Sequence, residues 1–411
     1  MNIHKQIKTF EQPDVQIFIN EHQYDRVEDL ALQYHKKVDF DLVFVLNQIE
    51  NQQKAARKLP LFVQKKCLFT NKNYQQATSQ RLAQYKQNMV EKGKTLLDLT
   101  AGLGSDAFFL SQNFEYTTLI ETDADHVALL KYNLDKLDAK NTEIVHTSAE
   151  LFLQNNPNFK ADALYIDPDR RQEHQRTTTL EHSTPNVLEL MPKLLPMAQN
   201  IYLKTSPMLD ISMAIEQINA IKNQSINTIF VLAENNEVKE ILFKINNQTI
   251  ENQIINIETI HFNKDKIERY LGNQNDKPTA KIISHKPQFL YEPNNAIIKA
   301  QLVKQYADEH HLWHINPQTN YLFLDHILTD FQGRIFEIAE QLPYKIKDIK
   351  TYLKHHQITQ ANIAKRNFFD DVKTIRQQLN IKDGGEYYLF FTKNQLDKGV
   401  CFVCKKIKSS L

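Results

Sequence analysis

The strongest constraint on the fold is an alternation of strand-like and helix-like segments between about residues 94 and 262. Strands are predicted at the short apolar runs "TLLDLTAG", "YTTLIETD", "TEIVHTS", "ADALYIDP", "NIYLKTSP", "NTIFVLAENN" and "IINIETIHF". Helices are predicted between them, at "SDAFFLSQNF", "ADHVALLKYNLDKLD", "AELFLQNN", "TPNVLELMPKLLPMA", "MLDISMAIEQI" and "EVKEILFKI". Because parallel strands are joined by crossovers, this order predicts an α/β fold, a Rossmann-like sheet covered by helices. Ligands of such sheets bind beyond the carboxyl ends of the strands.

Other patterns flank the alternating segment. Residues 1–85 carry apolar residues at three- and four-residue spacing, as in "FDLVFVLNQIENQQKAARKL", and predict a helical N-terminal region. The alternation lapses after residue 261, and residues 335–408 predict strand, helix, strand, helix and then a pair of strands. We therefore expect four parts, with boundaries at 1–85, 86–261, 262–334 and 335–411, of which the last is a compact α+β unit.

Charge is distributed unevenly along a chain whose net charge is only +1. Residues 332–411 hold 15 Lys and Arg against 8 Asp and Glu, an excess of +7, which leaves −6 for the rest. The basic C-terminal end is thus a candidate for contacting phosphates. No run of 18 apolar residues predicts a membrane span, and the N-terminus has no apolar signal segment. Three cysteines build no disulfide framework and fit a reducing cytosol. From the cysteines we expect no disulfide partners and a cytoplasmic location, and from the lack of long apolar runs we expect no contact with a membrane.

The sharpest motif is "DLTAGLGSDAFFL", where a strand meets a helix through a glycine-containing turn. Asp98 ends the strand, Gly102 and Gly104 form the turn, and Asp106 opens the helix. Glycines let a backbone approach a ligand closely at a helix N-terminus. Glu121 ends the next strand, 17 residues after Gly104, where an acid can accept both hydroxyls of a ribose.

Two cofactors compete for this geometry. Gly102, Gly104 and Ala107 fit the dinucleotide fingerprint G-x-G-x-x-A. However, Asp98 lies four residues before the first glycine, where a carboxylate would repel pyrophosphate and suit a cationic α-amino group. S-adenosylmethionine (SAM) carries both that group and a ribose, so SAM is the favoured cofactor. The residues expected to bind it are Asp98, Thr100, Gly102, Gly104, Asp106, Glu121, Ser148 and Ala149, the last two in "HTSAE", where an adenine amine can be read.

The fourth strand ends in an unusual group of charges, "YIDPDRR". In a SAM site this strand end faces the methyl group. Methylation of an exocyclic amine needs acceptors for its N–H groups rather than a strong base, and the Asp167 carboxylate and Pro168 carbonyl supply two. The related motif Asp/Asn-Pro-Pro-aromatic stacks a ring on the base, whereas this chain has Asp169 and Arg170 in those places. Arg170 and Arg171 are open to two interpretations: contact with a base or phosphate, or ion pairs with neighbouring acids.

Together, "DLTAGLGSDAFFL", "YIDPDRR", "LKTSPMLDI", "VLAENNEVKEILF", "FLYEPNNAIIKA", "NIAKRNF" and "LNIKDGGEYYLFFT" resemble one family. It comprises the class I SAM-dependent methyltransferases with a C-terminal THUMP-like domain. The resemblance implies a helical N-terminal part, a Rossmann-like methyltransferase domain, a small ferredoxin-like segment at 262–334 and a THUMP-like domain at 335–411.

The resemblance also implies roles for single residues. Asp98, Gly102, Gly104 and Glu121 would hold SAM, and Asp167 and Pro168 would face the acceptor. Ser79 and Lys86 lie in "ATSQRLAQYK", which matches a family segment expected to close over the cofactor. Residues expected to bind substrate are Asp169, Arg170, Arg171, Lys204, Ser206 and Pro207.

Weaker patterns have simpler structural interpretations. Cys401 and Cys404 are three residues apart in a predicted strand, so they would point to opposite faces, and no second Cys pair completes a zinc site. The histidines of "HHLWH" lack a nearby carboxylate motif, and no metal site is expected. The basic and aromatic segments "KRNF" and "KIKDIKTYLKHH" fit either an RNA backbone or a solvated helix face.

These patterns predict an enzyme, a SAM-dependent methyltransferase acting on a base nitrogen, an exocyclic amine, in RNA such as tRNA or rRNA. THUMP domains proper present RNA to attached modification enzymes, and RNA is therefore the expected partner. Two alternatives remain open: a methyltransferase for a protein or small metabolite, and a non-catalytic protein that binds SAM or RNA.

Overall fold

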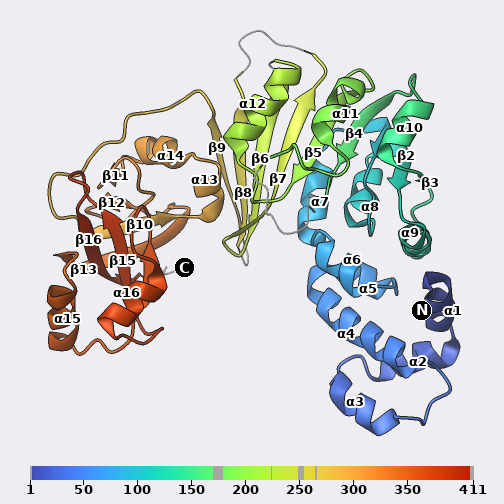
Figure 1. Ribbon diagram of the computed structural model, residues 1–411, viewed down its shortest axis with the longest axis horizontal. Coiled ribbons are helices and arrows are strands. Elements are labelled where there is room, and N and C mark those ends of the chain that lie inside the picture. Colours follow the sequence, from blue (N-terminus) through green and yellow to red (C-terminus); the bar gives the residue numbers. More distant parts are fainter. Residues whose placement is uncertain (1, 170–178, 224, 249–253, 264–265, 408–411) are drawn as a thin grey trace. The chain divides into compact units, whose positions relative to one another are not determined.

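The computed structural model describes residues 2–169, 179–223, 225–248, 254–263 and 266–407. The chain divides into two compact units, the first made of residues 1–227 and 242–253 and the second of residues 228–241 and 254–411. Figure 1 labels most of the helices and strands of both units.

The first unit begins with seven helices, as the spacing of apolar residues predicts. They are α1 (Ile3–Phe10), α2 (Pro13–Glu21), α3 (Val27–Tyr34), α4 (Leu42–Lys58), α5 (Pro60–Gln64), α6 (Asn71–Gln76) and α7 (Gln80–Met89). Buried side chains of α1–α5, such as Val45, Ile49 and Phe62, share one core with Phe108 and Leu130 of the sheet's helices α8 and α9. The N-terminal helices are therefore packed onto the α/β part by a continuous apolar core.

The α/β part alternates strands and helices in the predicted order. Its elements are β1 (Gly93–Asp98), α8 (Ser105–Ser111), β2 (Phe114–Glu121), α9 (Ala124–Lys136), β3 (Thr142–His146), α10 (Ala149–Asn155), β4 (Ala161–Ile166), α11 (Val187–Leu194), β5 (Ala198–Thr205) and α12 (Ile211–Ile221). The strands lie in the order β3-β2-β1-β4-β5, and all four pairings are parallel. This confirms the predicted parallel sheet and brings the carboxyl ends of β1, β4 and β5 side by side.

The segment "EVKEILFKI" is not the predicted helix. It forms β7 (Glu237–Asn246), which follows β6 (Ile226–Glu234) through Asn235 and Asn236. Both asparagines have positive φ, 52° and 62°, the backbone conformation of the two-residue turns that join neighbouring strands. Asn tolerates this conformation, and the β-branched residues of the segment suit a strand, so the turn overrides the helical interpretation.

The second unit continues from the β6–β7 turn. Its other elements are β8 (Asn256–Asn263), β9 (Lys266–Asn273), β10 (Phe289–Pro293), α13 (Asn295–Lys299), α14 (Val303–Glu309), β11 (Trp313–His314), β12 (Leu322–Leu324), β13 (Gly333–Pro343), α15 (Ile346–His355), β14 (Asn362–Lys365), α16 (Val372–Leu379), β15 (Tyr387–Lys393) and β16 (Gly399–Lys406). The segment after residue 332 thus has the predicted order of strands and helices. Its final pair, β15 and β16, is antiparallel.

A seven-stranded sheet in the order β11-β12-β10-β13-β16-β15-β14 organises this unit. β10 pairs with β13 from Phe289 opposite Glu337 to Pro293 opposite Gly333, so strands from both sides of residue 334 share one sheet. Cys401 is buried in the core under α15 and α16, and Cys404 in a separate core with Phe336 and Phe402. The two cysteines therefore face opposite sides of the sheet, as their spacing predicts. The four domain boundaries remain predictions.

No described helix is both long and apolar enough to span a bilayer. Among the described residues, no group of three or more His, Cys, Asp or Glu side chains is arranged to hold a metal ion. His314 of "HHLWH" is buried at the edge of the seven-stranded sheet, where burial lowers its pKa.

Candidate active site

The glycine turn after β1 has the backbone that its sequence requires. Gly102 and Gly104 have φ values of +55° and +88°, a region that residues with a Cβ rarely adopt. A Cβ on Gly104 would lie 2.5 Å from Leu130 Cδ1, so this glycine lets α8 start against α9. A Cβ on Gly102 would meet nothing nearer than the Thr100 carbonyl oxygen at 3.9 Å. Gly102 therefore faces open space, where a ligand can approach the backbone.

Asp98 lies at the base of this turn and is almost fully buried. Its Oδ1 accepts a hydrogen bond from the Thr100 N–H at 2.9 Å. Burial raises the pKa of Asp98 to about 7, further increased by Asp106 and Asp167 and opposed by the Thr100 hydrogen bond and Lys204. A carboxyl group with such a pKa is ready to ionise fully when a cation binds beside it.

Glu121 ends β2 and faces the same turn. One carboxylate oxygen accepts the Gly102 N–H at 3.2 Å, and the other accepts the N–H groups of Thr122 and Asp123 at 2.8 and 3.0 Å. Burial tends to raise the pKa of Glu121, but His126 and the backbone donors outweigh it and hold the pKa below its usual value. Glu121 is thus an ionised acceptor at the position expected to read a ribose.

Ser148 and Ala149 lie where β3 passes into α10. The Ser148 hydroxyl caps the helix by accepting the Leu151 N–H at 3.2 Å, and Ala149 is buried. These contacts fix the loop at the end of β3, beside the end of β2 that carries Glu121.

The end of β4 adjoins the glycine turn directly. The Asp167 N–H donates to Thr100 Oγ1 at 2.7 Å, so the first residue of "DPDRR" is fastened to the loop after β1. Pro168 is buried, and Asp169 is exposed and exchanges two backbone hydrogen bonds with Thr184, at 2.8 and 2.7 Å. The candidates Arg170 and Arg171 lie outside the described residues.

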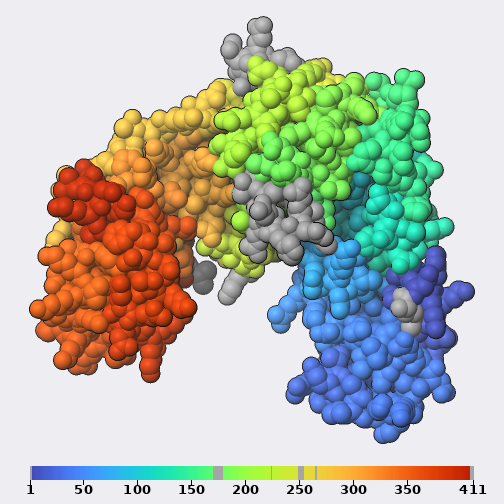
Figure 2. Space-filling view, viewed as in Figure 1, coloured from blue at the N-terminus to red at the C-terminus, as the bar shows by residue number. Residues whose placement is uncertain are grey.

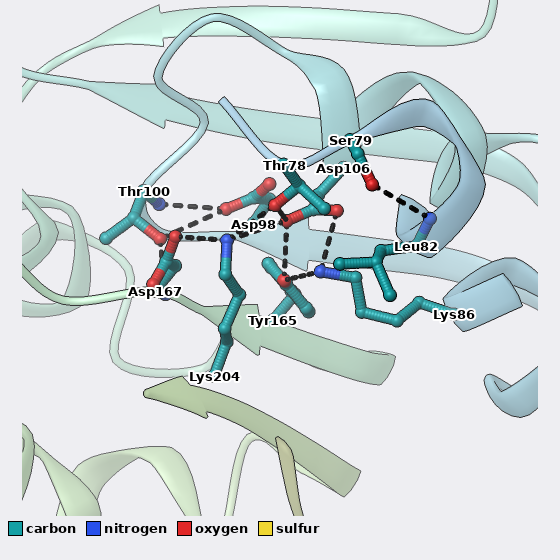
Figure 3. A network of polar contacts seen from close by, with 10 residues as sticks. All are labelled: Thr78, Ser79, Leu82, Lys86, Asp98, Thr100, Asp106, Tyr165, Asp167 and Lys204. Atoms are coloured by element: carbon teal, nitrogen blue, oxygen red, sulfur yellow. Dashed lines mark hydrogen bonds and ion pairs between the residues drawn. The ribbon is translucent and has the colours of Figure 1, made fainter. Parts of the chain in front are cut away.

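Lys204 projects from β5 into the space between the carboxylates of Asp106 and Asp167 (Figure 3). Its Nζ lies 2.7 Å from Asp167 Oδ2 and 3.1 Å from Asp106 Oδ2. It also donates to Thr78 Oγ1 at 2.8 Å. Of the two other candidates on this strand end, Ser206 accepts the Met208 N–H at 3.3 Å, and Pro207 is partly exposed.

A second, fully buried lysine lies behind Asp106. Lys86 of α7 places its Nζ 2.8 Å from Asp106 Oδ1 and 3.2 Å from the Tyr165 hydroxyl. Tyr165 and Thr78 both donate to Asp106 Oδ2 at 2.9 Å, as Figure 3 shows. Tyr165 and Thr78 were not among the site residues predicted from the sequence. A Lys on the apolar face of a helix and a Tyr inside a buried strand were the available signals, because both need polar partners when buried.

Ser79 and Asp106 also have defined places. Ser79 caps α7 by accepting the Leu82 N–H at 3.4 Å, which sets the start of the helix that carries Lys86. Burial tends to raise the pKa of Asp106, but Lys204 and Lys86, together with the hydrogen bonds from Lys86 and Tyr165, hold it well below its usual range. Asp106 is therefore an ionised centre between two ammonium groups.

The arrangement suits a positively charged ligand. Asp98, Asp106 and Asp167 gather around Lys86 and Lys204, which leaves one negative charge in excess when all five ionise. The open space at Gly102 lies between the carboxyl ends of β1 and β2. These features fit SAM, which carries an α-amino group for Asp98 and ribose hydroxyls for Glu121. They fit a pyrophosphate less well, because an anion would meet buried carboxylates.

Comparisons with known proteins cover both units. Residues 53–234 match the family model described as Conserved hypothetical protein 95, and residues 333–406 match the THUMP domain-like family. Two proteins from strains of Mycobacterium tuberculosis, both named as uncharacterized S-adenosylmethionine-dependent methyltransferases, are 21% identical over 350 residues, which is 82% of this chain and 88% of each relative. A protein from Porphyromonas gingivalis W83, named as a methyltransferase, has a crystal structure that matches with a TM-score of 0.81 and 23% identity. The match covers 96% of this chain and 98% of that one, and it shows the fold.

Proposed function

We propose that this chain, which belongs to the class I SAM-dependent methyltransferases with a C-terminal THUMP-like domain, methylates an exocyclic amine of a base in RNA. The observation that carries this proposal is the placement of Asp167. Its backbone is fixed to the glycine turn through Thr100, and its carboxylate is held by Lys204. An acceptor group would thereby lie where a cofactor bound to that turn ends.

The cofactor would be held by three groups of this chain. Asp98 would take the α-amino group, Glu121 the ribose hydroxyls, and the open backbone at Gly102 would let the ligand lie against the turn. When bound, SAM supplies a methyl group on a sulfonium, which is already activated for transfer. The protein then has to place the acceptor rather than create a strong nucleophile.

Asp167 and Pro168 would perform that placement. The carboxylate of Asp167 and the carbonyl oxygen of Pro168 would accept the two N–H bonds of an exocyclic amine, so that the nitrogen lone pair points along the line of displacement. Lys204 supports this role by holding one oxygen of Asp167 and leaving the other oxygen to the substrate.

The second unit supports RNA as the acceptor. Its THUMP-like segment carries the basic excess of the chain. Lys347, Lys350 and Lys354 are exposed at three- and four-residue spacing on one face of α15, and none of them pairs with an acid among the described residues. We call these three residues the α15 lysine row. The segment that carries them has an orange colour in Figure 2. Such a row can follow a phosphate backbone.

An exposed aromatic ring belongs to the same part of the chain. Phe369 is 58% exposed and stacks on Phe368, with the ring centroids 4.3 Å apart. Tyr344, directly before the residue that caps α15, contacts the same ring edge-on at 5.4 Å. An exposed aromatic ring suits the stacking of an unpaired base.

The proposal is tested with SAM that carries a deuterated methyl group. The full chain is incubated with unmodified total RNA, which is digested to nucleosides for mass spectrometry. We expect the label in one nucleoside methylated on an exocyclic amine. Label on a carbon or a ribose oxygen, or no label in RNA while a protein or metabolite fraction becomes labelled, would contradict the proposal.

Deleting residues 335–411 is a poor way to separate an RNA substrate from a small one. β13 pairs with β10 and β16, so the deletion would remove strands from a shared sheet and expose its core. Surface substitutions on α15 leave that sheet intact and separate the two substrates cleanly.

A further inference from the structure

We propose that Lys86 is a positioning residue of the methyl-transfer site: it neutralises Asp106 and thereby leaves the ammonium group of Lys204 to hold Asp167. This inference rests on the proposed function, because it assigns Asp167 to the acceptor. It adds a residue of the N-terminal helices to the machinery, although α7 precedes the sheet in the chain.

The first step concerns Lys86 itself. Its side chain is fully buried, and its Nζ contacts Asp106 Oδ1 at 2.8 Å and the Tyr165 hydroxyl at 3.2 Å. A buried ammonium group is costly unless a carboxylate and hydrogen bonds compensate for its lost hydration. An apolar side chain of the same length would fill this space at lower cost, so Lys86 needs an explanation beyond packing.

The second step concerns the two oxygens of Asp106. Oδ1 faces Lys86, whereas Oδ2 accepts from Thr78 and Tyr165 at 2.9 Å and lies 3.1 Å from Lys204. The carboxylate is therefore shared between two cations that come from different elements, α7 and β5. Neither cation has to neutralise it alone.

The third step concerns Lys204, which is shared in turn. Its Nζ is closer to Asp167, at 2.7 Å, than to Asp106, at 3.1 Å. The Asp167 side chain is 37% exposed and that of Asp106 only 9%, so attraction toward Asp106 is less screened by water. Lys204 favours the more exposed carboxylate because Lys86 already compensates for the charge of the buried one.

The two lysines therefore have different roles: Lys86 compensates for the charge of Asp106, and Lys204 holds Asp167. Without the charge of Lys86, Asp106 would draw Lys204 toward itself, and Asp167 would lose the contact that fixes its carboxylate. The cofactor groups Asp98 and Glu121 have other hydrogen bonds, from Thr100 and from the backbone at 102, 122 and 123, and would stay in place. Loss of the Lys86 charge should therefore slow methyl transfer to the acceptor and leave the affinity for the cofactor nearly unchanged.

The test is Lys86→Met, which keeps the length of the side chain and removes its charge. We expect kcat for RNA methylation to fall by about 10- to 100-fold, the size of effect that misplacement by about 1 Å produces. SAM affinity measured by calorimetry should not weaken by more than about threefold. In a crystal structure of the variant, Lys204 Nζ should leave Asp167 and contact Asp106. An unchanged kcat, or a Lys204–Asp167 contact that persists, would overturn the inference. So would an equal loss of SAM affinity and kcat, which would make Lys86 a cofactor-site residue.

If Lys86→Met does not fold, Tyr165→Phe provides the second variant, because it removes only the hydroxyl that donates to Asp106. We expect a several-fold lower kcat with SAM affinity retained, and an unchanged kcat would again refute the inference. Lys54→Met is the control: Lys54 also lies in the N-terminal helices, where its ammonium group pairs with Glu50 at the surface. Wild-type protein that does not methylate RNA would refute the proposed function instead, so the two failures are distinguishable.

Discussion

The two units use their positive charges in opposite ways. In the first unit the buried Lys86 pairs with Asp106, and Lys204 pairs with Asp106 and Asp167, at distances of 2.7 to 3.1 Å. In the second unit the α15 lysine row projects into solvent without acidic partners among the described residues. Buried charges hold a fixed geometry that salt barely affects, whereas exposed charges attract a polyanion over a distance and are screened by salt. The first arrangement suits chemistry and the second suits capture of a substrate.

The largest combined effect on kcat and stability is expected from removing the carboxylate between the two buried lysines. Asp106→Asn should lower kcat by about 100-fold, because Lys86 and Lys204 lose the group that keeps them in place. It should also lower the free energy of unfolding by about 3 kcal/mol, since a buried ammonium is left uncompensated. Rapid-quench kinetics and urea unfolding measure the two quantities.

Glu292→Gln is the matched control in the second unit. Glu292 is similarly buried and pairs with Arg334 and Arg366, which joins β10 to β13 and to the residue after β14. This variant should lose stability but keep kcat. A similar loss of kcat in both variants would show that Asp106 acts only through stability, and the contrast between the two clusters would disappear.

The next largest effect concerns the α15 lysine row. Replacing Lys347, Lys350 and Lys354 together by Gln should weaken RNA binding about 30-fold at low salt and reduce the slope of log K against log salt by about 2. Affinity for SAM should stay unchanged. Filter binding across a salt series gives both values, and three exposed lysines of the N-terminal region, Lys5 of α1 and Lys36 and Lys37 after α3, provide a control triple. Equal losses in the two triples would indicate nonspecific attraction rather than a site on α15.

A smaller effect is expected from pH on cofactor binding. Because burial raises the pKa of Asp98 to about 7, this carboxyl is protonated below pH 7 and would not attract a cationic α-amino group. A ligand that binds only the ionised form loses affinity as pH falls through the pKa, so the Kd for SAM should be about eightfold weaker at pH 6 than at pH 7.5. Calorimetry at the two pH values tests this. Asp98→Asn should bind weakly but without the pH dependence, and a wild-type Kd that does not change with pH would remove Asp98 from the cofactor site.

The smallest effect should come from the exposed ring. Phe369→Ala removes a stacking surface for a base, which is worth about 1 kcal/mol at the low end of measured values, or about fivefold in RNA affinity. Exchange of the exposed Leu396 for Ala is the control for loss of a surface apolar group. If single-stranded RNA binds both variants as tightly as the wild type, the ring has no part in recognition.

Local patterns were enough to predict the α/β part. Glycine at the turn, acids at strand ends and apolar runs of strand length are properties of a few neighbouring residues. The parallel direction of β1–β5 followed from the alternation of strands with helices. β7 was mistaken for a helix because its apolar spacing fits both periods. The deciding signal was the Asn235–Asn236 turn, which sets the direction of the chain.

Local sequence patterns could not predict the charge network, and the reason is physical. Thr78, Lys86, Asp106, Tyr165 and Lys204 come from separate elements, and only the fold brings them together (Figure 3). None of these residues stands in a recognisable motif for such a network. Their roles depend on which carboxylate oxygen contacts which ammonium group. The resemblance implied that Lys204 lies beside Asp167, and the pairing of β4 with β5 accounts for this, because adjacent parallel strands end at the same edge.

The most direct test of the account compares two aspartates of β4 and its end. Asp162 accepts the backbone N–H groups of Lys94 and Thr95 at one end of the strand, and Asp167 follows the other end beside Lys204. The measurement is the single-turnover rate of methyl transfer from SAM to RNA for Asp167→Ala and Asp162→Ala. The account predicts a loss of at least about 100-fold for Asp167→Ala, with SAM affinity retained, and a rate near wild type for Asp162→Ala. Methyl transfer at the wild-type rate by Asp167→Ala would contradict it.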